Sequence, residues 1–171
     1  MPIRQTTQLK DAATLAEIGQ STFVESFGHL YSPENLSAFL RDAHSVERAM
    51  HYLNSAEHCV WLHEDQNGIT DGYCIAGATT LPVPNCPDSA GELCRLYVRR
   101  SQHGSGIGGQ LLAQALTWMS ERFEHHYISV YQKNDGAIRL YRRHGFEIIH
   151  EYKFMVGQHA DPEFIMHCHN N

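Results

Sequence analysis

The segment that most constrains the fold of this chain is a predicted strand, turn and helix at residues 92–123. Residues 92–98 mix apolar and β-favouring side chains over a length typical of a strand. Apolar residues then recur every four positions and predict an amphipathic helix: Ile107, Leu111, Ala115, Met119 and Phe123. Glycines cluster where this helix begins: Gly104, Gly106, Gly108 and Gly109. Because glycine leaves the first N–H groups of a helix uncovered, the turn is suited to hold a phosphate.

Two familiar phosphate motifs can be compared with this turn. A P-loop needs Lys and then Ser or Thr directly after its last glycine, whereas Gln110 and Leu111 follow Gly109. The dinucleotide fingerprint G-x-G-x-x-G fits the glycine spacing, but its downstream acid, Glu124, falls at the end of the helix and not on a strand. The local pattern also leaves open a turn that only lets helix and strand pack closely.

Length and composition limit the class of protein. At 171 residues the chain is expected to form one domain, residues 1–171. No apolar run approaches the roughly 18 residues that span a bilayer, and the first residues lack a signal core, so we expect a cytoplasmic protein without membrane association. The formal charge of −6 disfavours nucleic acid as a partner and favours a cationic substrate. Five cysteines without a C-x-x-C pair argue against a disulfide framework or a thiolate zinc site.

The remaining chain alternates between helical and strand-like patterns. Capping residues mark four helix starts, at Asp11, Ser32, Ser45 and Asn134 or Asp135. Strand patterns cover residues 3–7, 59–63, 72–81, 92–98, 127–131, 146–156 and 164–169. A polar turn is expected at 158–162, between the last two strands, and Gly145 ends the helix before them. This order predicts a mixed α/β layer fold.

Two segments carry a resemblance to a known family. Residues 103–108, preceded by Leu96-Tyr97-Val98, resemble the pyrophosphate loop of the GCN5-related N-acetyltransferase superfamily, in which Gln or Arg precedes two spaced glycines. His103 stands at the Gln or Arg position, where backbone amides and the helix dipole still attract an anion. Residues 129–146 are similar to the second signature of that superfamily, a strand followed by Asn, Ala, Tyr and Gly-Phe. The order of the two signatures also agrees, which makes chance agreement on both far less probable than on one.

The resemblance implies a fold, a cosubstrate and a set of binding residues. The fold would be one α/β domain with a mixed, mostly antiparallel sheet of about seven strands flanked by helices. The cosubstrate would be acetyl-CoA, with its pantetheine arm paired to the backbone of Leu96 and Val98 and with direct transfer in a ternary complex. The implied coenzyme-binding residues are Leu96, Tyr97, Val98, His103, Gly104, Ser105, Gly106, Ile107, Gly108, Gly109, Asn134, Ala137 and Tyr141. A homodimer is a family-level expectation.

The same resemblance points to an acceptor. Short matches at residues 22–23, 32–36 and 133–146, and in the tail at Phe154, Gly157 and Ile165-Met166, are similar to bacterial spermidine/spermine N-acetyltransferases. This similarity implies a polyamine or another small primary amine. A polyamine site should present carboxylates, and four are available on the predicted helices and strand: Glu25, Glu34, Asp42 and Glu92. Protein N-termini, amino acids or drug amines are alternative acceptors. A coenzyme sensor without catalysis is an alternative from another class.

Acetyl transfer to an amine needs a group that accepts a proton. Amines are mostly ammonium at neutral pH, so a base must act before the nitrogen can attack. Glu92 is the candidate base, because it opens the central strand and, at period two, shares a face with Cys94, Leu96 and Val98. The alternative is a solvated carboxylate at a strand end.

The departing thiolate needs a proton donor, and Tyr141 is the candidate. It follows Asn134 by seven residues, two helical turns, so both lie on one helix face. A phenol is mostly protonated at pH 7 and can donate to a thiolate. The alternatives are a core aromatic residue at Tyr141 and a simple helix cap at Asn134.

Two other groups of residues have simpler interpretations. His167 and His169 alternate on one strand with no third ligand in the sequence, so we expect no metal site. Four arginines are expected mainly at a solvated rim: Arg99, Arg100, Arg142 and Arg143.

Overall fold

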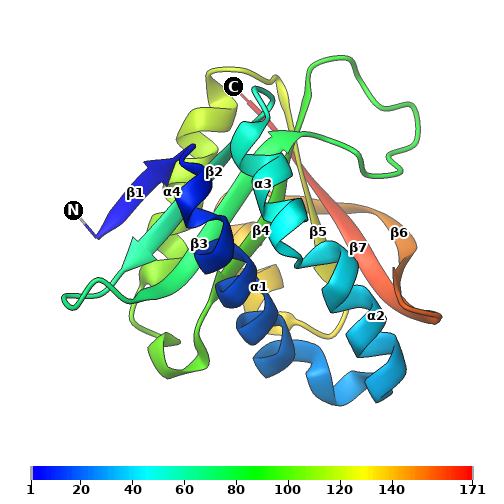
Figure 1. Cartoon of the computed structure of the whole chain (residues 1–171). Helices are drawn as coiled ribbons and strands as arrows, with labels where there is room; N and C mark the ends of the chain where they lie inside the picture. Colours follow the sequence, from blue (N-terminus) through cyan, green and yellow to red (C-terminus); the bar gives the residue numbers. More distant parts are fainter. Residues whose placement is uncertain (1, 171) are drawn as a thin grey trace.

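A seven-stranded sheet organises the computed structural model, which describes residues 2–170 (Figure 1). The strand order is β1-β2-β3-β4-β5-β7-β6, and only the β4–β5 pair is parallel. The strands are β1 (Ile3–Thr6), β2 (His58–Glu64), β3 (Thr70–Ala78), β4 (Ala90–Val98), β5 (His125–Tyr131), β6 (Glu147–Val156) and β7 (His159–His169). The expected mixed, mostly antiparallel sheet is therefore confirmed.

Helices cover both faces of this sheet. They are α1 (Ala12–Phe27), α2 (Pro33–Ala43), α3 (Val46–Asn54), α4 (Ile107–Ser120) and α5 (Asp135–Arg143). Figure 1 shows α1, α2 and α3 in front of the sheet and α4 behind it. The predicted apolar face of α4 is buried in one core with α5, while α1 and α3 form a second core on the opposite face. No helix in residues 2–170 is long and apolar enough to cross a membrane.

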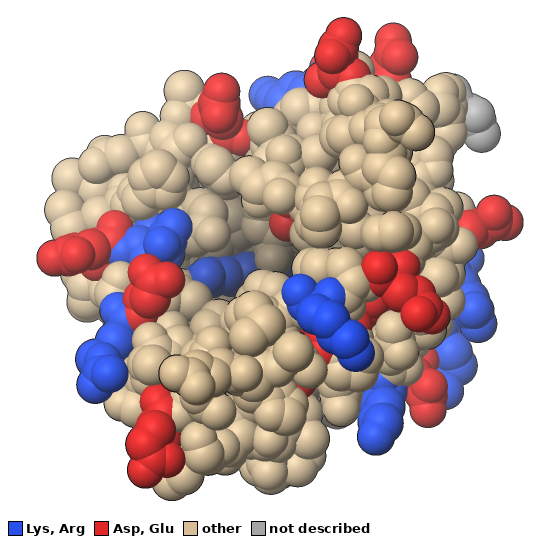
Figure 2. Space-filling model, turned by 90° about the vertical axis from the view of Figure 1, so that its right-hand side faces the viewer, with Lys and Arg blue, Asp and Glu red and all other residues tan. Residues whose placement is uncertain are grey.

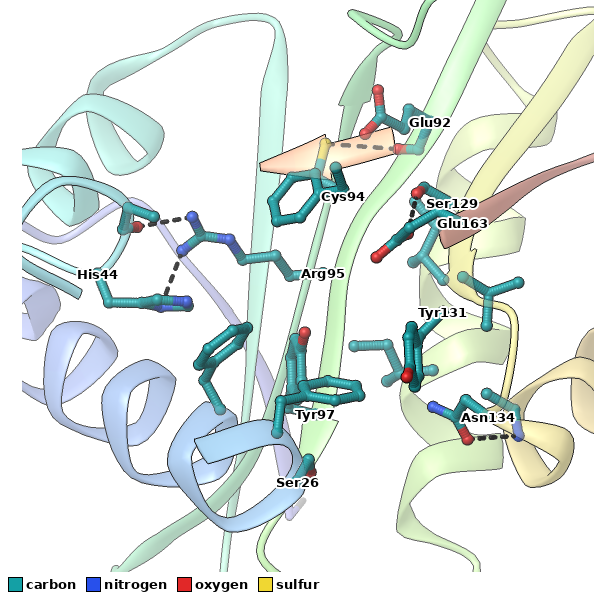
Figure 3. Close-up of a pocket in the computed structure, with 18 of the residues that line it drawn as sticks. Ser26, His44, Glu92, Cys94, Arg95, Tyr97, Ser129, Tyr131, Asn134 and Glu163 are labelled. Carbon is teal, nitrogen blue, oxygen red and sulfur yellow. Dashed lines mark hydrogen bonds between the residues drawn. The ribbon is translucent and has the colours of Figure 1, made fainter. Parts of the chain in front are cut away.

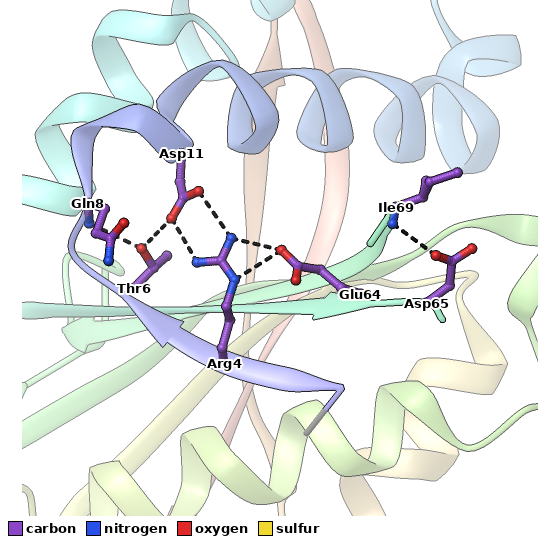
Figure 4. Close-up of polar contacts among 7 residues, drawn as sticks. All are labelled: Arg4, Thr6, Gln8, Asp11, Glu64, Asp65 and Ile69. Atoms are coloured by element: carbon purple, nitrogen blue, oxygen red, sulfur yellow. Dashed lines mark hydrogen bonds and ion pairs between the residues drawn. The ribbon is translucent and has the colours of Figure 1, made fainter. Parts of the chain in front are cut away.

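Three of the four predicted helix caps are confirmed. The side chains of Ser32, Ser45 and Asn134 each accept a hydrogen bond from a backbone N–H of the first helical turn. Asp11 stands at the start of α1 but makes no capping bond, so that prediction was wrong. Figure 4 shows the reason: Arg4 and the hydroxyl of Thr6 donate hydrogen bonds to the Asp11 carboxylate instead.

Arg4 connects three elements through this contact. Its guanidinium lies 2.8 Å from the carboxylates of both Asp11 and Glu64, which joins β1 to the start of α1 and the end of β2. Hydrogen bonds from Arg4 hold the pKa of Asp11 below its usual range. A carboxylate already paired with a guanidinium is a poor acceptor for helix N–H groups, because the ionic hydrogen bond is the stronger one.

The polar turn predicted at residues 158–162 is shorter than expected. Strand β7 begins at His159 and includes Pro162, so the turn is limited to Gly157 and Gln158. Proline is tolerated there because the last β5–β7 pair is Tyr131 with Glu163. The backbone of Pro162 faces the side on which β5 has ended, so no strand partner requires an N–H from this residue. Its carbonyl accepts a hydrogen bond from the N–H of Gln132.

The β6–β7 turn holds helix α2 against the sheet. The backbone N–H of Gln158 donates to the Asn35 side chain over 3.0 Å. Gly157 has a φ of +58°, and a Cβ there would lie 2.7 Å from the Cα of Asn35. Only glycine fits both the left-handed backbone and the close approach of α2.

We expect Gly157→Ala to destabilise the protein more than Gly68→Ala. Both residues have positive φ, but a Cβ at Gly68, in the β2–β3 hairpin, meets open space. Gly68→Ala should lower the free energy of unfolding by about 1–2 kcal/mol from backbone strain alone. Gly157→Ala should lower the free energy of unfolding by about 1–3 kcal/mol more than Gly68→Ala, because helix α2 must move away from the added methyl group. Chemical denaturation of both variants measures the difference, and equal losses would contradict the docking role.

Candidate active site

The site begins where β4 and β5 diverge. The two strands pair only between residues 90–93 and 125–128. Beyond these residues β4 continues to pair with β3, and β5 with β7, so the facing edges of β4 and β5 separate. A cavity of about 980 Å³ opens at this divergence. Figure 2 shows the hollowed face of the molecule, with basic and acidic side chains inside the hollow.

A β-bulge in β4 changes which side chains face the cavity. Leu93 pairs with Ala76 and Arg95 with Ile75, so Cys94 is the additional residue. Leu96 and Val98 consequently pack toward α4, while Cys94 packs toward α1 and α3. The expectation that Glu92, Cys94, Leu96 and Val98 share one face was therefore wrong, because the bulge interrupts the period of two.

The glycine-rich turn forms one end of the cavity. Gly106 precedes α4 with a φ of +89° and has no side-chain cap, so the first amides of the helix stay uncovered. Cβ atoms at Gly104 and Gly109 would meet open space. An anion can therefore reach the backbone at the positive end of the helix dipole. The residues present fit the phosphates of a coenzyme.

His103 braces this turn from inside. Its Nε2 lies 2.9 Å from the carbonyl oxygen of Val98, across the loop between β4 and α4. As an Nε2–H donor, the ring links this loop back to the last residue of β4. The hydroxyl of Ser105 donates to the carbonyl of Gln102 and adds a second internal tie.

Most of the predicted coenzyme-binding residues line the cavity. They are Leu96, Tyr97, Val98, His103, Gly104, Gly106, Ile107, Gly108, Asn134, Ala137 and Tyr141. Ser105 and Gly109 lie in the same turn but are not part of the lining. Leu96 and Val98 belong to the stretch of β4 that has no partner on the β5 side. The backbone of Leu96 and the N–H of Val98 are available to a ligand, whereas the Val98 carbonyl contacts His103.

Tyr141 projects from α5 into the junction between the core and the cavity. The side chain is buried, and its ring meets Phe146 edge-on at 6.3 Å. Burial raises the pKa of the phenol well above its ordinary value, so the hydroxyl keeps its proton at neutral pH. Tyr141 is thus both a core residue and a potential proton donor.

Glu92 is buried on the β4 wall. Its carboxylate accepts hydrogen bonds from the hydroxyl of Thr79, at 3.1 Å, and from the N–H of Thr80, at 3.0 Å. Burial raises the pKa of Glu92, and these hydrogen bonds partly oppose the increase. The carboxylate is fixed at the cavity and is not the solvated group that the sequence left open.

Two further carboxylates come from β7, and sequence analysis did not single them out. Glu163 accepts a hydrogen bond from the hydroxyl of Ser129, which also contacts the Tyr152 hydroxyl. Burial raises the pKa of Glu163 to about 7. Asp161 accepts from the Tyr31 hydroxyl. The alternation of Asp161, Glu163 and Ile165 was a usable signal, but residues 158–162 were expected to form a turn.

Arg95 and His44 form the opposite wall, and they were also missed. Arg95 donates to the carbonyl of Ala43 at 2.6 Å and lies 3.3 Å from Nδ1 of His44. Burial lowers the pKa of His44 to about 3, so its imidazole is neutral and can accept. A Cβ on Gly19 would lie 2.6 Å from the same Nδ1, so glycine in α1 makes room for His44.

The acidic residues proposed from sequence are only partly brought together. Glu92 and Asp42 line the cavity, whereas Glu25 and Glu34 do not. Glu25 instead accepts from the backbone N–H of Arg100. Asp42 pairs with Arg48 at 3.1 Å.

The histidine-rich end of the sheet offers no metal centre in the described chain. His125 and His167 contact each other over 3.0 Å. Across residues 2–170, no group of three or more His, Cys, Asp or Glu side chains is arranged to hold a metal ion.

A profile of the Acetyltransferase (GNAT) family matches residues 21–146, most of the chain. The protein belongs to this family. It is an acetyl-CoA-dependent N-acetyltransferase of the GNAT fold.

Individual relatives support the same assignment. An uncharacterized N-acetyltransferase of Mycobacterium tuberculosis is 28% identical over 162 residues, covering 92% of this chain and 97% of that protein. The crystal structure of PaiA N-acetyltransferase from Thermoplasma acidophilum with coenzyme A superposes with a TM-score of 0.75 at 18% identity, covering 99% of both chains. YncA from Salmonella typhimurium, solved with acetyl-CoA, gives a TM-score of 0.67 at 18% identity, covering 99% of this chain and 93% of that one. At these identities the solved structures establish the fold.

Proposed function

We propose that this N-acetyltransferase acts on a small primary amine that attacks the acetyl group directly, with amine and acetyl-CoA bound together. The observation that carries this proposal is the continuity of the cavity, which runs from the open glycine turn to the buried carboxylates of Glu92 and Glu163. In the reaction the amine nitrogen forms a C–N bond, the C–S bond breaks, the nitrogen loses a proton and the sulfur gains one.

The donor half of the cavity supplies backbone groups. Amides at the start of α4 would hold the phosphates, and the backbone of Leu96 and the N–H of Val98 would pair with the pantetheine amides. His103 would act indirectly, because its ring is already engaged with the Val98 carbonyl. A turn that is closed in advance loses less entropy when an anion binds.

The acceptor half supplies carboxylates and aromatic rings. A polyamine is one acceptor class, supported by Glu92, Asp161 and Glu163 in the lining and by the sequence resemblance to PaiA-type enzymes. Protein N-termini, amino acids and drug amines form the second class. Aromatic side chains of Phe23 and Phe39, with centroids 4.7 Å apart, give the cavity an apolar wall suited to either class.

Calorimetric titration with acetyl-CoA, followed by a thiol-release screen, tests the proposed function. We expect binding of acetyl-CoA and amine-dependent release of free thiol with at least one of spermidine, diamines, amino acids or short peptides. Binding without turnover on any amine would favour the coenzyme sensor, and absence of binding would remove both functions.

We predict that Tyr141→Phe lowers turnover while leaving folding and coenzyme affinity nearly unchanged. The variant keeps the ring packing and removes only the proton donor, so kcat should fall by about 10²–10⁴-fold if chemistry is rate-limiting. Tyr127→Phe is the matched control, because Tyr127 is a buried tyrosine outside the cavity lining. Near-normal turnover of Tyr141→Phe, with product release shown not to limit the rate, would exclude the catalytic role.

We predict that a buried carboxylate of the cavity accepts the amine proton. Glu92 and Glu163 are both candidates, and Glu163 is favoured because its pKa of about 7 lies near neutral pH. A base acts only when deprotonated, so kcat/KM should rise as the pH increases through about 7. Glu163→Gln should remove this rise.

Glu92→Gln is the matched control, because it removes the other buried carboxylate from the same cavity. It should lower the rate but preserve the rise near pH 7. Persistence of the rise in Glu163→Gln, together with its loss in Glu92→Gln, would assign the base to Glu92.

A further inference from the structure

Arg95 is held at the cavity wall by neutral groups. Figure 3 shows its side chain extending from β4 toward His44, on the side of the cavity away from Glu163. The guanidinium donates to the carbonyl of Ala43 and to the neutral ring of His44, and it lies over the Tyr52 ring at 5.3 Å from the centroid. These contacts fix the orientation of the group and use two of its five N–H donors.

This arginine lacks a countercharge within the described chain. Four other arginines form ion pairs with carboxylates: Arg4, Arg48, Arg99 and Arg122. Across residues 2–170, no Asp or Glu lies within ion-pair distance of Arg95. A guanidinium keeps its charge at any physiological pH, and a partly desolvated charge without a partner is unfavourable. An anion brought by a ligand would remove this cost.

The carboxylates that line the cavity all have other partners than Arg95. Glu92 is held by Thr79 and Thr80, Glu163 by Ser129, and Asp161 by Tyr31 and His159. Figure 3 shows Glu92 and Glu163 on the side of the cavity opposite His44. The Asp42 carboxylate is already paired with Arg48. The cavity therefore carries the carboxyl groups of Glu92 and Glu163 on one wall and the guanidinium of Arg95, without a carboxylate partner, on the other.

We propose that Arg95 binds a carboxylate of the acceptor, so that the natural acceptor is a primary amine that also carries a carboxylate, such as an amino acid. This inference rests on the proposed acetyl transfer and narrows its acceptor class. The ammonium end is attracted to the Glu92 and Glu163 wall, and the planar guanidinium matches the two oxygens of a carboxylate. A polyamine would place another positive charge against Arg95, and repulsion makes that placement unfavourable.

The test compares acids with their own amides. The probes are α-amino acids and ω-amino acids of increasing length, each assayed beside its carboxamide, with spermidine as the polycationic probe. We expect kcat/KM for at least one free acid to exceed that of its amide by about 10- to 100-fold, the range expected for a hydrogen bond to a charged group. Arg95→Met should abolish this preference, and Arg95→Lys should retain part of it.

Two controls separate the subsite from folding and from the reaction itself. Arg122→Met removes an arginine that lies over Trp118, outside the cavity, and should keep the acid preference. Calorimetry should give the same acetyl-CoA affinity for Arg95→Met and the wild type, because the coenzyme phosphates belong to the glycine turn. Melting temperatures report whether loss of the Ala43 contact unfolds the α2–α3 wall.

The outcomes distinguish this inference from the proposed function. Turnover of spermidine or of amides at least equal to that of every free acid would overturn the carboxylate subsite while leaving acetyl transfer intact. An acid preference that survives in a folded Arg95→Met would also overturn it. Failure to bind acetyl-CoA would overturn the proposed function itself.

Discussion

The site depends on the separation of two parallel strands in a sheet that is otherwise continuous. Paired backbone groups satisfy each other, so a cavity lined by strand edges can form only where pairing stops. Here it stops after Leu93 on β4 and Ile128 on β5, because β5 continues along β7 while β4 remains with β3. Beyond this point the backbone of β4 has no strand partner on the β5 side, whichever side chains it carries.

The bulge at Cys94 adds a second constraint. An extra residue in β4 shifts the alternation, so Arg95 faces the α1 and α3 side although the simple period of two would direct it toward α4. The same shift sends Leu96 toward the α4 core. One irregularity in hydrogen bonding therefore decides which β4 side chains face the α4 core and which face α1 and α3.

Burial gives the polar groups of the cavity properties that they would not have in water. Desolvation disfavours charge, which raises the pKa of Glu92 and Glu163 and lowers that of His44. A neutral His44 can then accept from Arg95, and Tyr141 remains a protonated donor. Exclusion of water therefore shifts the acid–base character of the groups that these residues supply.

The sequence by itself determined the parts of this protein that depend on neighbours along the chain. The amphipathic helix α4, the glycine turn before it and the caps at Ser32, Ser45 and Asn134 all follow from local spacing, because helix hydrogen bonds link residues only a few positions apart. The two family signatures added the fold, and they predict that Tyr141 lies near the coenzyme sulfur. Tertiary structure decided the rest.

Contacts between distant segments decided the main polar interactions. Asp11 resembles a helix cap in the sequence, but strand β1 places Arg4 beside it, and Arg4 pairs with its carboxylate. Glu163 gains its near-neutral pKa from burial among β5 and β6 side chains, and Arg95 meets His44 across 51 positions of sequence. Residue spacing along the chain does not predict these contacts, because they depend on the strand order and on the β4 bulge. Both are properties of the whole sheet.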